Sequence, residues 1–352
     1  MESLKAIRSS NWEVLRIIAM ILIIGHHIAL YSSFGAGNEL SEINKYWILF
    51  IEGGGKIGAN IFFLLSGYFL VSVKKWNKEK IIKIISQIWF YSIAIFCIFL
   101  SLDLIQFDWK LLLQALCPIA YSTWWFASAY FLLYLVFPFI NIMIENMREE
   151  KYRQLLVIAT ICFSVIPTFL NQTFQCNGFI WAIYLYLLGG YIKINISEKL
   201  IKLKINLVFL IIAIGITYIL TVILVKVPIC IEAVGVNRKQ FYDMQSILVL
   251  VISVLFIIVF MKIKINKSKI INRISMTTFG IYLIHENPYI REILYSNIFN
   301  NKKYSNSSGL ILYIVFEIIC IFIGGMLIEN IRILTIEKLV VKIYRLYESR
   351  KR

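Results

Sequence analysis

Apolar runs long enough to cross a lipid bilayer recur along almost the whole of this 352-residue chain. A helix needs about 20 mostly apolar residues to cross the hydrocarbon core. Hydrophobic residues make up 60% of the chain and charged residues 16%, and the mean hydropathy is +0.77. Soluble domains carry about 25% charged residues. We therefore expect an all-α, polytopic membrane protein, and no polar stretch of the sequence is long enough to form a soluble domain.

Ten segments have the length and composition of a membrane span. They are residues 12–33, 47–73, 82–104, 121–144, 153–170, 179–194, 206–226, 246–263, 272–291 and 309–334. The second is rich in glycine, which favours a broken or tilted span. The ninth is the least apolar. We expect residues 1–352 to form a single membrane-embedded domain.

The basic residues alternate between the two sides of the predicted spans. Twenty-five lie at the chain ends or in alternate loops, and eight lie in the opposite loops. Because cytoplasmic loops carry the excess of Lys and Arg, this pattern places both termini in the cytoplasm, with residues 335–352 as a basic cytoplasmic tail. The same pattern explains the net charge of +16 without a nucleic-acid partner.

Two of the three histidines, His26 and His27, lie inside the first apolar segment. Arg16 precedes His27 by eleven residues, about three helical turns, so both side chains fall within roughly 20° of one helix face and about 16 Å apart. Ionisable groups inside a membrane span are costly and usually mark a substrate or proton path. This pair is the strongest indication of chemistry in the sequence.

Two interpretations of the pair remain open at this point. Arg16 can extend toward the headgroups while the histidines are satisfied core residues. Alternatively, the guanidinium binds an anionic donor and the His27 imidazole is a general base. His26 fits the structural interpretation better, because its side chain points about 100° away from that of His27.

The second predicted span carries three further candidates for a substrate-contacting or structural role: Lys56, Asn60 and Ser66. Its small residues allow close helix packing. A role in helix packing explains these residues at least as well as direct contact with a substrate. Lys56 is a lone lysine in an apolar segment, and its side chain can line a cavity.

Lys80 and Lys83 lie one turn apart at the start of the third predicted span. A basic run in this position usually serves as an orientation signal. The alternative is that the two ammonium groups bind phosphates at the cytoplasmic mouth.

The ninth predicted span contains the third histidine, His285, beside Glu286, followed by Pro288, which is expected to break the helix. Adjacent helical residues point about 100° apart, so these two are not expected to pair with each other within one helix. Which residues elsewhere in the chain they contact stays open at this point. The sequence contains no phosphate-binding loop, nucleophile elbow or zinc-ligand spacing, and we predict no metal site.

Together these motifs resemble the acyltransferase-3 family of integral membrane O-acyltransferases, over nearly the whole chain. The family's arginine, ten residues and histidine correspond to Arg16 and His27. The remaining matches are Gly58, Phe62, Phe63, Ser66 and Gly67 in a G-x-x-x-F-F-x-x-S-G pattern, Trp124 to Phe126 leading to Tyr134 and Pro138, and Gly280 to His285. A two-arginine motif thought to meet coenzyme A is represented only by Lys80 and Lys83, and lysine cannot form a bidentate phosphate contact.

The resemblance implies transfer of an acetyl group from cytoplasmic acetyl-CoA, as co-substrate, to a hydroxyl of a cell-surface polysaccharide or its lipid-linked precursor. It implies Arg16 in donor binding and His27 in catalysis, no permanently bound cofactor, and a bacterial plasma membrane with its lipids as the setting. Trp125 joins the candidates for substrate contact. Whether His27 is a base or a transient acyl carrier stays open. The rival class is a membrane transporter or acyl-group carrier without complete transferase activity.

Overall fold

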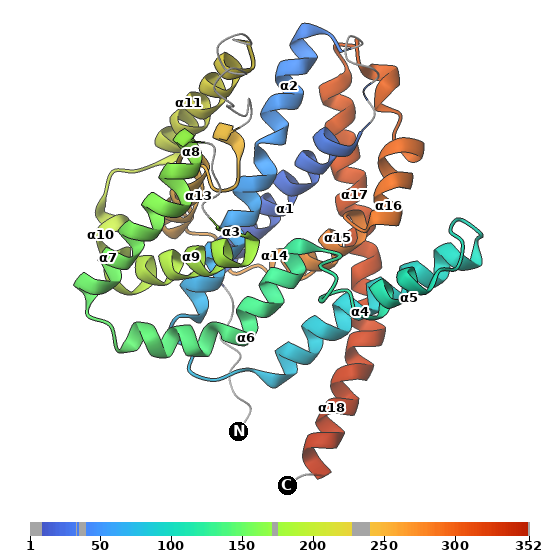
Figure 1. Ribbon diagram of the computed structural model, residues 1–352, viewed down its shortest axis with the longest axis horizontal. Helices are drawn as coiled ribbons and strands as arrows, with labels where there is room; N and C mark the ends of the chain where they lie inside the picture. Colours follow the sequence, from blue (N-terminus) through green and yellow to red (C-terminus); the bar gives the residue numbers. More distant parts are fainter. Residues whose placement is uncertain (1–8, 33, 35–39, 171–174, 227–239, 351–352) are drawn as a thin grey trace. The chain divides into compact units, whose positions relative to one another are not determined.

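The structure, a computed structural model, describes residues 9–32, 34, 40–170, 175–226 and 240–350 (Figure 1). Every regular element in these ranges is a helix, and none is a strand. The prediction of an all-α protein is therefore confirmed.

Eight helical stretches of the described chain are long and apolar enough to cross a membrane. They are Ser10–Tyr31, Glu42–Leu70, Lys78–Ser101, Trp125–Glu145, Glu149–Leu170, Gly178–Lys202, Gln240–Lys262 and Leu310–Arg350. A shorter apolar helix covers Leu207–Ile223. The protein is thus a multi-pass membrane protein, as expected, while the count of ten spans and the cytoplasmic placement of the termini stay predictions.

The helices cluster into two compact units, each built from separate parts of the sequence. Unit 1 contains Met1–His26, Tyr46–Val71 and Met147–Thr278, and unit 2 contains His27–Lys45, Ser72–Asn146 and Phe279–Arg352. Helix α1 (Ser10–Tyr31) begins in the first unit and ends in the second.

Unit 1 is assembled around α3 (Gly54–Leu70) and α9 (Gly178–Tyr191). Its other helices include α7 (Glu149–Thr160), α8 (Ile166–Leu170), α10 (Ser197–Lys202), α11 (Leu207–Lys226), α13 (Ile247–Lys262) and α14 (Lys269–Ser275), together with the part of α2 (Glu42–Glu52) from Tyr46 onward. A Cβ on Gly67 would collide with the Tyr186 carbonyl, and one on Gly189 with the Leu64 carbonyl. The two backbones are therefore in contact, which is the close packing that small residues permit.

The glycine-rich second span is irregular at Gly53 but forms one helical stretch from Glu42 to Leu70. Helix α2 ends at Glu52, and α3 begins at Gly54 after a turn at Gly53. A Cβ on Gly53 would lie 3.1 Å from the Tyr242 ring, so the Gly53 backbone and this ring approach closely.

The ninth predicted span, 272–291, is not one continuous helix, and this expectation is corrected. The segment contains α14, α15 (Thr278–His285) and α16 (Pro288–Glu292), followed by the π-helical η4 (Ile293–Ile298). Pro288 cannot donate a helical hydrogen bond, and the Asn287 side chain accepts one from the Tyr289 N–H instead. The residues around His285 therefore lie at helix ends.

Unit 2 contains α4 (Lys78–Ser101), α5 (Trp109–Leu116), α6 (Trp125–Glu145), α15, α16, η4, η5 (Asn301–Tyr304) and α17 (Leu310–Arg332). Of the residues predicted as a basic tail, 335–352, those up to Arg350 continue α17 as helix through η6 (Ile333–Glu337) and α18 (Lys338–Arg350), as Figure 1 shows. The whole stretch from Leu310 has 41 residues. It is therefore about twice as long as a bilayer requires.

Candidate acid–base site around His27

His27 meets the third histidine of the chain inside unit 2. Its Nδ1 lies 3.0 Å from Nε2 of His285, and the two ring centroids are 5.1 Å apart. Both residues are buried, with exposed fractions of 8% and 1%. Two residues 258 positions apart in sequence thus form a direct contact between α1 and α15.

The hydrogen bonds of His285 fix which nitrogen of His27 is basic. Nδ1 of His285 lies 2.6 Å from the Ile281 carbonyl, which can only accept, so this nitrogen carries a proton. In the neutral ring, Nε2 of His285 is then an acceptor, and Nδ1 of His27 donates to it. The neutral His27 ring consequently has its lone pair on Nε2. This is the tautomer that a general base or a nucleophile requires.

Glu286 provides an anionic partner for the same imidazole. Its Oε2 lies 3.2 Å from Nδ1 of His27. Its Oε1 accepts a hydrogen bond from the Tyr31 hydroxyl at 3.1 Å and lies 3.4 Å from Nη1 of Arg291. A carboxylate here can stabilise the imidazolium that forms when His27 takes a proton.

Tyr31 and Arg291 hold Glu286 in place. Nη1 of Arg291 donates to the Tyr31 hydroxyl at 2.9 Å, and the guanidinium lies 4.3 Å from the centroid of the Tyr31 ring. Tyr31 also packs against the His27 ring, with centroids 5.6 Å apart. We call His27, Tyr31, His285, Glu286 and Arg291 the His27 cluster.

The end of α15 explains how two adjacent residues both reach His27. His285 is the last residue of α15, and Glu286 follows in a turn before the Asn287 cap. Within a helix their side chains would point about 100° apart. As helix neighbours, the two were not expected to pair with each other. Their common partner is His27, which lies on another helix.

Aromatic rings extend the site on one side. Tyr282 lies 6.5 Å from the His27 ring centroid, and Phe126 packs edge-on against Tyr282 at 5.5 Å. Trp125 in turn packs edge-on against Phe126 at 5.8 Å and is 39% exposed. Trp125 therefore lies two ring contacts from Tyr282, where a partly exposed indole can meet a substrate.

Arg16 lies in unit 1, beside a buried carboxylate. Its Nη1 donates to Glu13 Oε1 at 2.6 Å, and its guanidinium lies 5.4 Å from the centroid of the Phe69 ring. Glu13 also accepts a hydrogen bond from the Ser275 hydroxyl. Guanidinium groups carry five N–H donors, so the contact with Glu13 leaves Arg16 capacity for an anionic ligand.

The other candidates in unit 1 make structural contacts. His26 points to the Glu52 carbonyl and packs against Gly55, where a Cβ would collide with its ring. Asn60 donates to the Met244 carbonyl at 3.0 Å and accepts from the Trp181 indole at 2.8 Å, and Ser66 donates to the Phe62 carbonyl of its own helix. Lys56 is half-buried on α3.

Lys80 and Lys83 differ in their surroundings in unit 2. The Lys80 ammonium lies 4.5 Å from the centroid of the Tyr134 ring. The Lys83 ammonium lies 3.1 Å from Glu79 and 3.4 Å from Glu337. Two carboxylates already neutralise Lys83, which reduces its ability to bind a phosphate group.

Tyr31 and Arg291 are the members of the His27 cluster that sequence reasoning missed. Tyr31 follows His27 by four residues and therefore lies on the same helix face, a signal that the sequence contains. Arg291 counted only as a charge in an outer loop, and nothing in its local sequence pairs it with residue 31. Among the residues that the structure describes, no group of three or more His, Cys, Asp and Glu has metal-binding geometry.

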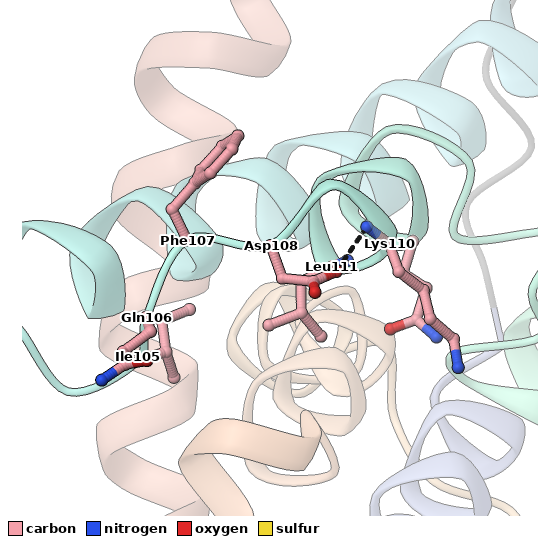
Figure 2. Close-up of a pocket in the computed structure, with 7 residues that line it drawn as sticks. Ile105, Gln106, Phe107, Asp108, Lys110 and Leu111 are labelled. Atoms are coloured by element: carbon pink, nitrogen blue, oxygen red, sulfur yellow. Dashed lines mark hydrogen bonds between the residues drawn. The ribbon is translucent and has the colours of Figure 1, made fainter.

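An open hollow of about 580 Å³ lies before and at the start of α5. Figure 2 shows its lining, which consists of Ile105, Gln106, Phe107, Asp108, Lys110, Leu111 and Gln114. Asp108 caps α5 by accepting from the backbone N–H groups of Lys110 and Leu111. The hollow shares no residue with the His27 cluster, so we assign it no part in the chemistry.

The helices and the buried imidazole–carboxylate cluster describe a polytopic membrane protein with ionisable groups in its interior. Residues 10–329 match the family model described as an acyltransferase domain, Acyl_transf_3. The chain therefore belongs to the acyltransferase-3 family, and it is a membrane acyltransferase. No curated protein and no solved structure matches the chain.

Proposed function

We propose that the protein is an O-acetyltransferase that moves an acetyl group from cytoplasmic acetyl-CoA to a hydroxyl of a cell-surface polysaccharide or its lipid-linked precursor. The observation that carries this proposal is the environment of His27. Its Nδ1 lies between His285 Nε2, at 3.0 Å, and Glu286 Oε2, at 3.2 Å, so that Nε2 is the basic nitrogen. Family membership supplies the reaction class.

In the proposed reaction, His27 Nε2 takes the proton of the acceptor hydroxyl as that oxygen attacks the thioester carbonyl carbon. The new C–O bond forms, the C–S bond breaks, and the coenzyme A thiolate leaves. The imidazolium then returns the proton to the thiolate, so protons balance over one turnover. Glu286 stabilises the imidazolium, and His285 fixes the ring orientation.

The same nitrogen can act first as a nucleophile, which would make His27 an acyl carrier. The tautomer derived from the His285 contacts suits both routes, because both use Nε2. Rapid quenching with radiolabelled acetyl-CoA in the absence of acceptor separates them. Label that stays on the protein and is lost in His27→Ala supports the acyl carrier, and unlabelled wild-type protein supports the base.

We propose that the donor is bound through Arg16 and Lys80. Arg16 retains N–H donors beyond its contact with Glu13, and the Lys80 ammonium lies over the Tyr134 ring rather than against a carboxylate. Lys83, paired with Glu79 and Glu337, is expected to contribute less. We expect acetyl-CoA to act as a co-substrate, with no permanently bound cofactor.

The proposed setting is a bacterial plasma membrane, with membrane lipid around the spans and a glycan or lipid-linked glycan as acceptor. The test is ester-linked acetate on the surface polysaccharide of cells that lack the protein and are complemented with wild type, His27→Ala, Arg16→Ala or His26→Ala, at equal membrane levels. We expect wild type to restore the ester, His27→Ala and Arg16→Ala to fail, and His26→Ala to retain most activity.

Unchanged acetate in cells lacking the protein would contradict the proposal. Full activity of both Arg16→Ala and His27→Ala would contradict the site assignment. Movement of a solute or acyl group without consumption of the thioester would favour the transporter class instead.

A further inference from the structure

A second group of buried polar side chains lies in unit 2 outside the His27 cluster. Tyr295 on η4, Asn301 on η5 and Glu317 on α17 are 1%, 1% and 0% exposed. The Tyr295 hydroxyl, Asn301 Oδ1 and both carboxylate oxygens of Glu317 lack a hydrogen-bond partner among the described residues. Asn301 approaches Glu317 without meeting ordinary hydrogen-bond geometry, and its Nδ2 donates to the Ser32 hydroxyl at 2.9 Å.

Four oxygen atoms that are buried together without partners require an explanation. A buried polar group without a hydrogen bond costs about 1–3 kcal/mol, and a bare buried charge costs more. Such atoms in a native protein usually bind water, an ion or a ligand. Glu317 is also an ionisable residue inside a membrane-spanning helix, where such groups are costly and often functional.

These side chains adjoin the His27 cluster through aromatic contacts. The rings of Tyr295 and Tyr31 have centroids 6.0 Å apart, and Tyr31 donates to Glu286. Glu286 and Glu317 both lie close enough to act electrostatically on the Tyr295 hydroxyl. Tyr295 is thus within electrostatic reach of the Glu286 carboxylate, which contacts His27, and of the Glu317 carboxylate.

We propose that Tyr295, Asn301 and Glu317 form a second site that binds a hydroxyl group next to the His27 cluster. A hydroxyl both donates and accepts, and the site offers both functions. The carboxylate and amide oxygens accept its proton in a hydrogen bond, and the Tyr295 O–H donates to its oxygen. The hydroxyl belongs either to a bound water molecule or to the acceptor.

This inference rests on the proposed acyl transfer, since it assigns a role beside the same catalytic histidine. The first experiment compares Tyr295→Phe and Glu317→Gln with wild type in the full-length protein. Ester-linked acetate is measured in complemented cells, and acetyl-CoA hydrolysis is measured with purified protein in lipid nanodiscs without acceptor. Tyr242→Phe, which alters another buried tyrosine in unit 1, is the matched control.

We expect each variant to lower ester formation about tenfold, the effect of one lost hydrogen bond to a partly charged group, while Tyr242→Phe stays near wild type. If hydrolysis without acceptor is unchanged, the bound hydroxyl is the acceptor's. If hydrolysis falls in parallel, the bound hydroxyl is that of water. Wild-type ester formation in both variants would overturn the inference, and it would leave the proposed function intact as long as His27→Ala is inactive.

The second experiment is thermal unfolding of Glu317→Leu in the same nanodiscs. A dry site gains stability when an unpartnered carboxylate is replaced by an apolar side chain of similar size. A hydroxyl-filled site loses a hydrogen-bond partner instead. We expect a lower unfolding midpoint. A higher midpoint would overturn the inference, as would stabilisation of wild type by sodium or potassium ions that Glu317→Gln abolishes, because a cation would then occupy the site.

Discussion

The His27 cluster and a buried cluster around Glu329, both in unit 2, use charge in different ways. In the His27 cluster, an imidazole is oriented by His285 and Glu286 through one nitrogen. In the second, which we call the Glu329 cluster, Gln87, Tyr91 and Arg332 surround one carboxylate. Glu329 Oε1 accepts from Gln87 and Arg332, and its Oε2 accepts from Tyr91 and Arg332, at 2.6–2.9 Å.

The difference separates a structural cluster from a chemical one. Both carboxylate oxygens of Glu329 are satisfied twice, and a two-point contact pairs it with Arg332, so this cluster ties α4 to α17. The His27 cluster instead orients one nitrogen of an imidazole and makes the other basic. Burial of ionisable groups therefore does not by itself identify a reactive site, and we propose that the hydrogen-bond pattern distinguishes the two clusters.

The largest expected effect is a loss of transfer activity that is not matched by a comparable loss of stability. We expect His27→Ala to lower acetyl transfer about 1,000-fold, because it removes the proton acceptor. The unfolding midpoint should fall less than it does on loss of the Glu329 carboxylate, since Glu286 keeps its contacts with Tyr31 and Arg291. Transfer per mole of folded protein and thermal unfolding are measured on the same preparation. Activity within tenfold of wild type would remove His27 from the chemistry.

The Glu329 cluster should show the reverse pattern. Glu329→Ala leaves the Arg332 guanidinium buried beside only Glu337, and we expect a loss of about 3–5 kcal/mol of stability. Transfer by the protein that remains folded should stay close to wild type. Unfolding in denaturant gives the free energy, and activity is normalised to folded protein. A variant that is stable but inactive would show that our division between the clusters is wrong.

A smaller effect is expected for the carboxylate of the His27 cluster. Glu286→Gln keeps the size of the side chain but removes the charge that stabilises the imidazolium, so we expect kcat to fall about 100-fold with little change in the KM for acetyl-CoA. Steady-state kinetics checks this. A rise in KM alone would assign Glu286 to donor binding.

The smallest effect concerns Arg291, which orients Glu286 together with Tyr31. Arg291→Lys keeps the charge but loses the planar contact with the Tyr31 ring, and we expect a loss of about threefold in kcat. Arg291→Ala should cost more. Equal losses in both variants would indicate that the guanidinium shape, and not its charge, is what the cluster needs.

The periodic and compositional features of the fold were predictable from the sequence. Apolar runs predicted the helices, and the glycines at 53–55 coincide with the one-residue turn at Gly53 between α2 and α3. In the ninth span the break at Pro288 was expected, but the interruption between Ser275 and Thr278 was not, because the apolar character of residues 272–291 favoured one helix up to the proline. The helix after Arg332 was missed because its basic residues were interpreted only as an orientation signal.

The sequence predicted the candidate residues only where their spacing within a single helix pointed to them. Helical spacing identified His27, and the order His285–Glu286 made both residues candidates. Their common contact with His27 depends on packing between α1 and the end of α15, which spans 258 positions of sequence. Local patterns contain no information about such a contact, and the same limit hid Arg291, Tyr295 and Glu317.

The central claim is that His27 and Glu286 act as one acid–base unit, and a double-mutant cycle tests it most directly. Transfer rates are compared for wild type, His27→Ala, Glu286→Gln and the double variant, at equal amounts of folded protein. Groups that act as a unit are strongly non-additive. We predict that the double variant is no slower than His27→Ala alone. A further 100-fold loss in the double variant would show that Glu286 acts independently of His27 and would contradict the account.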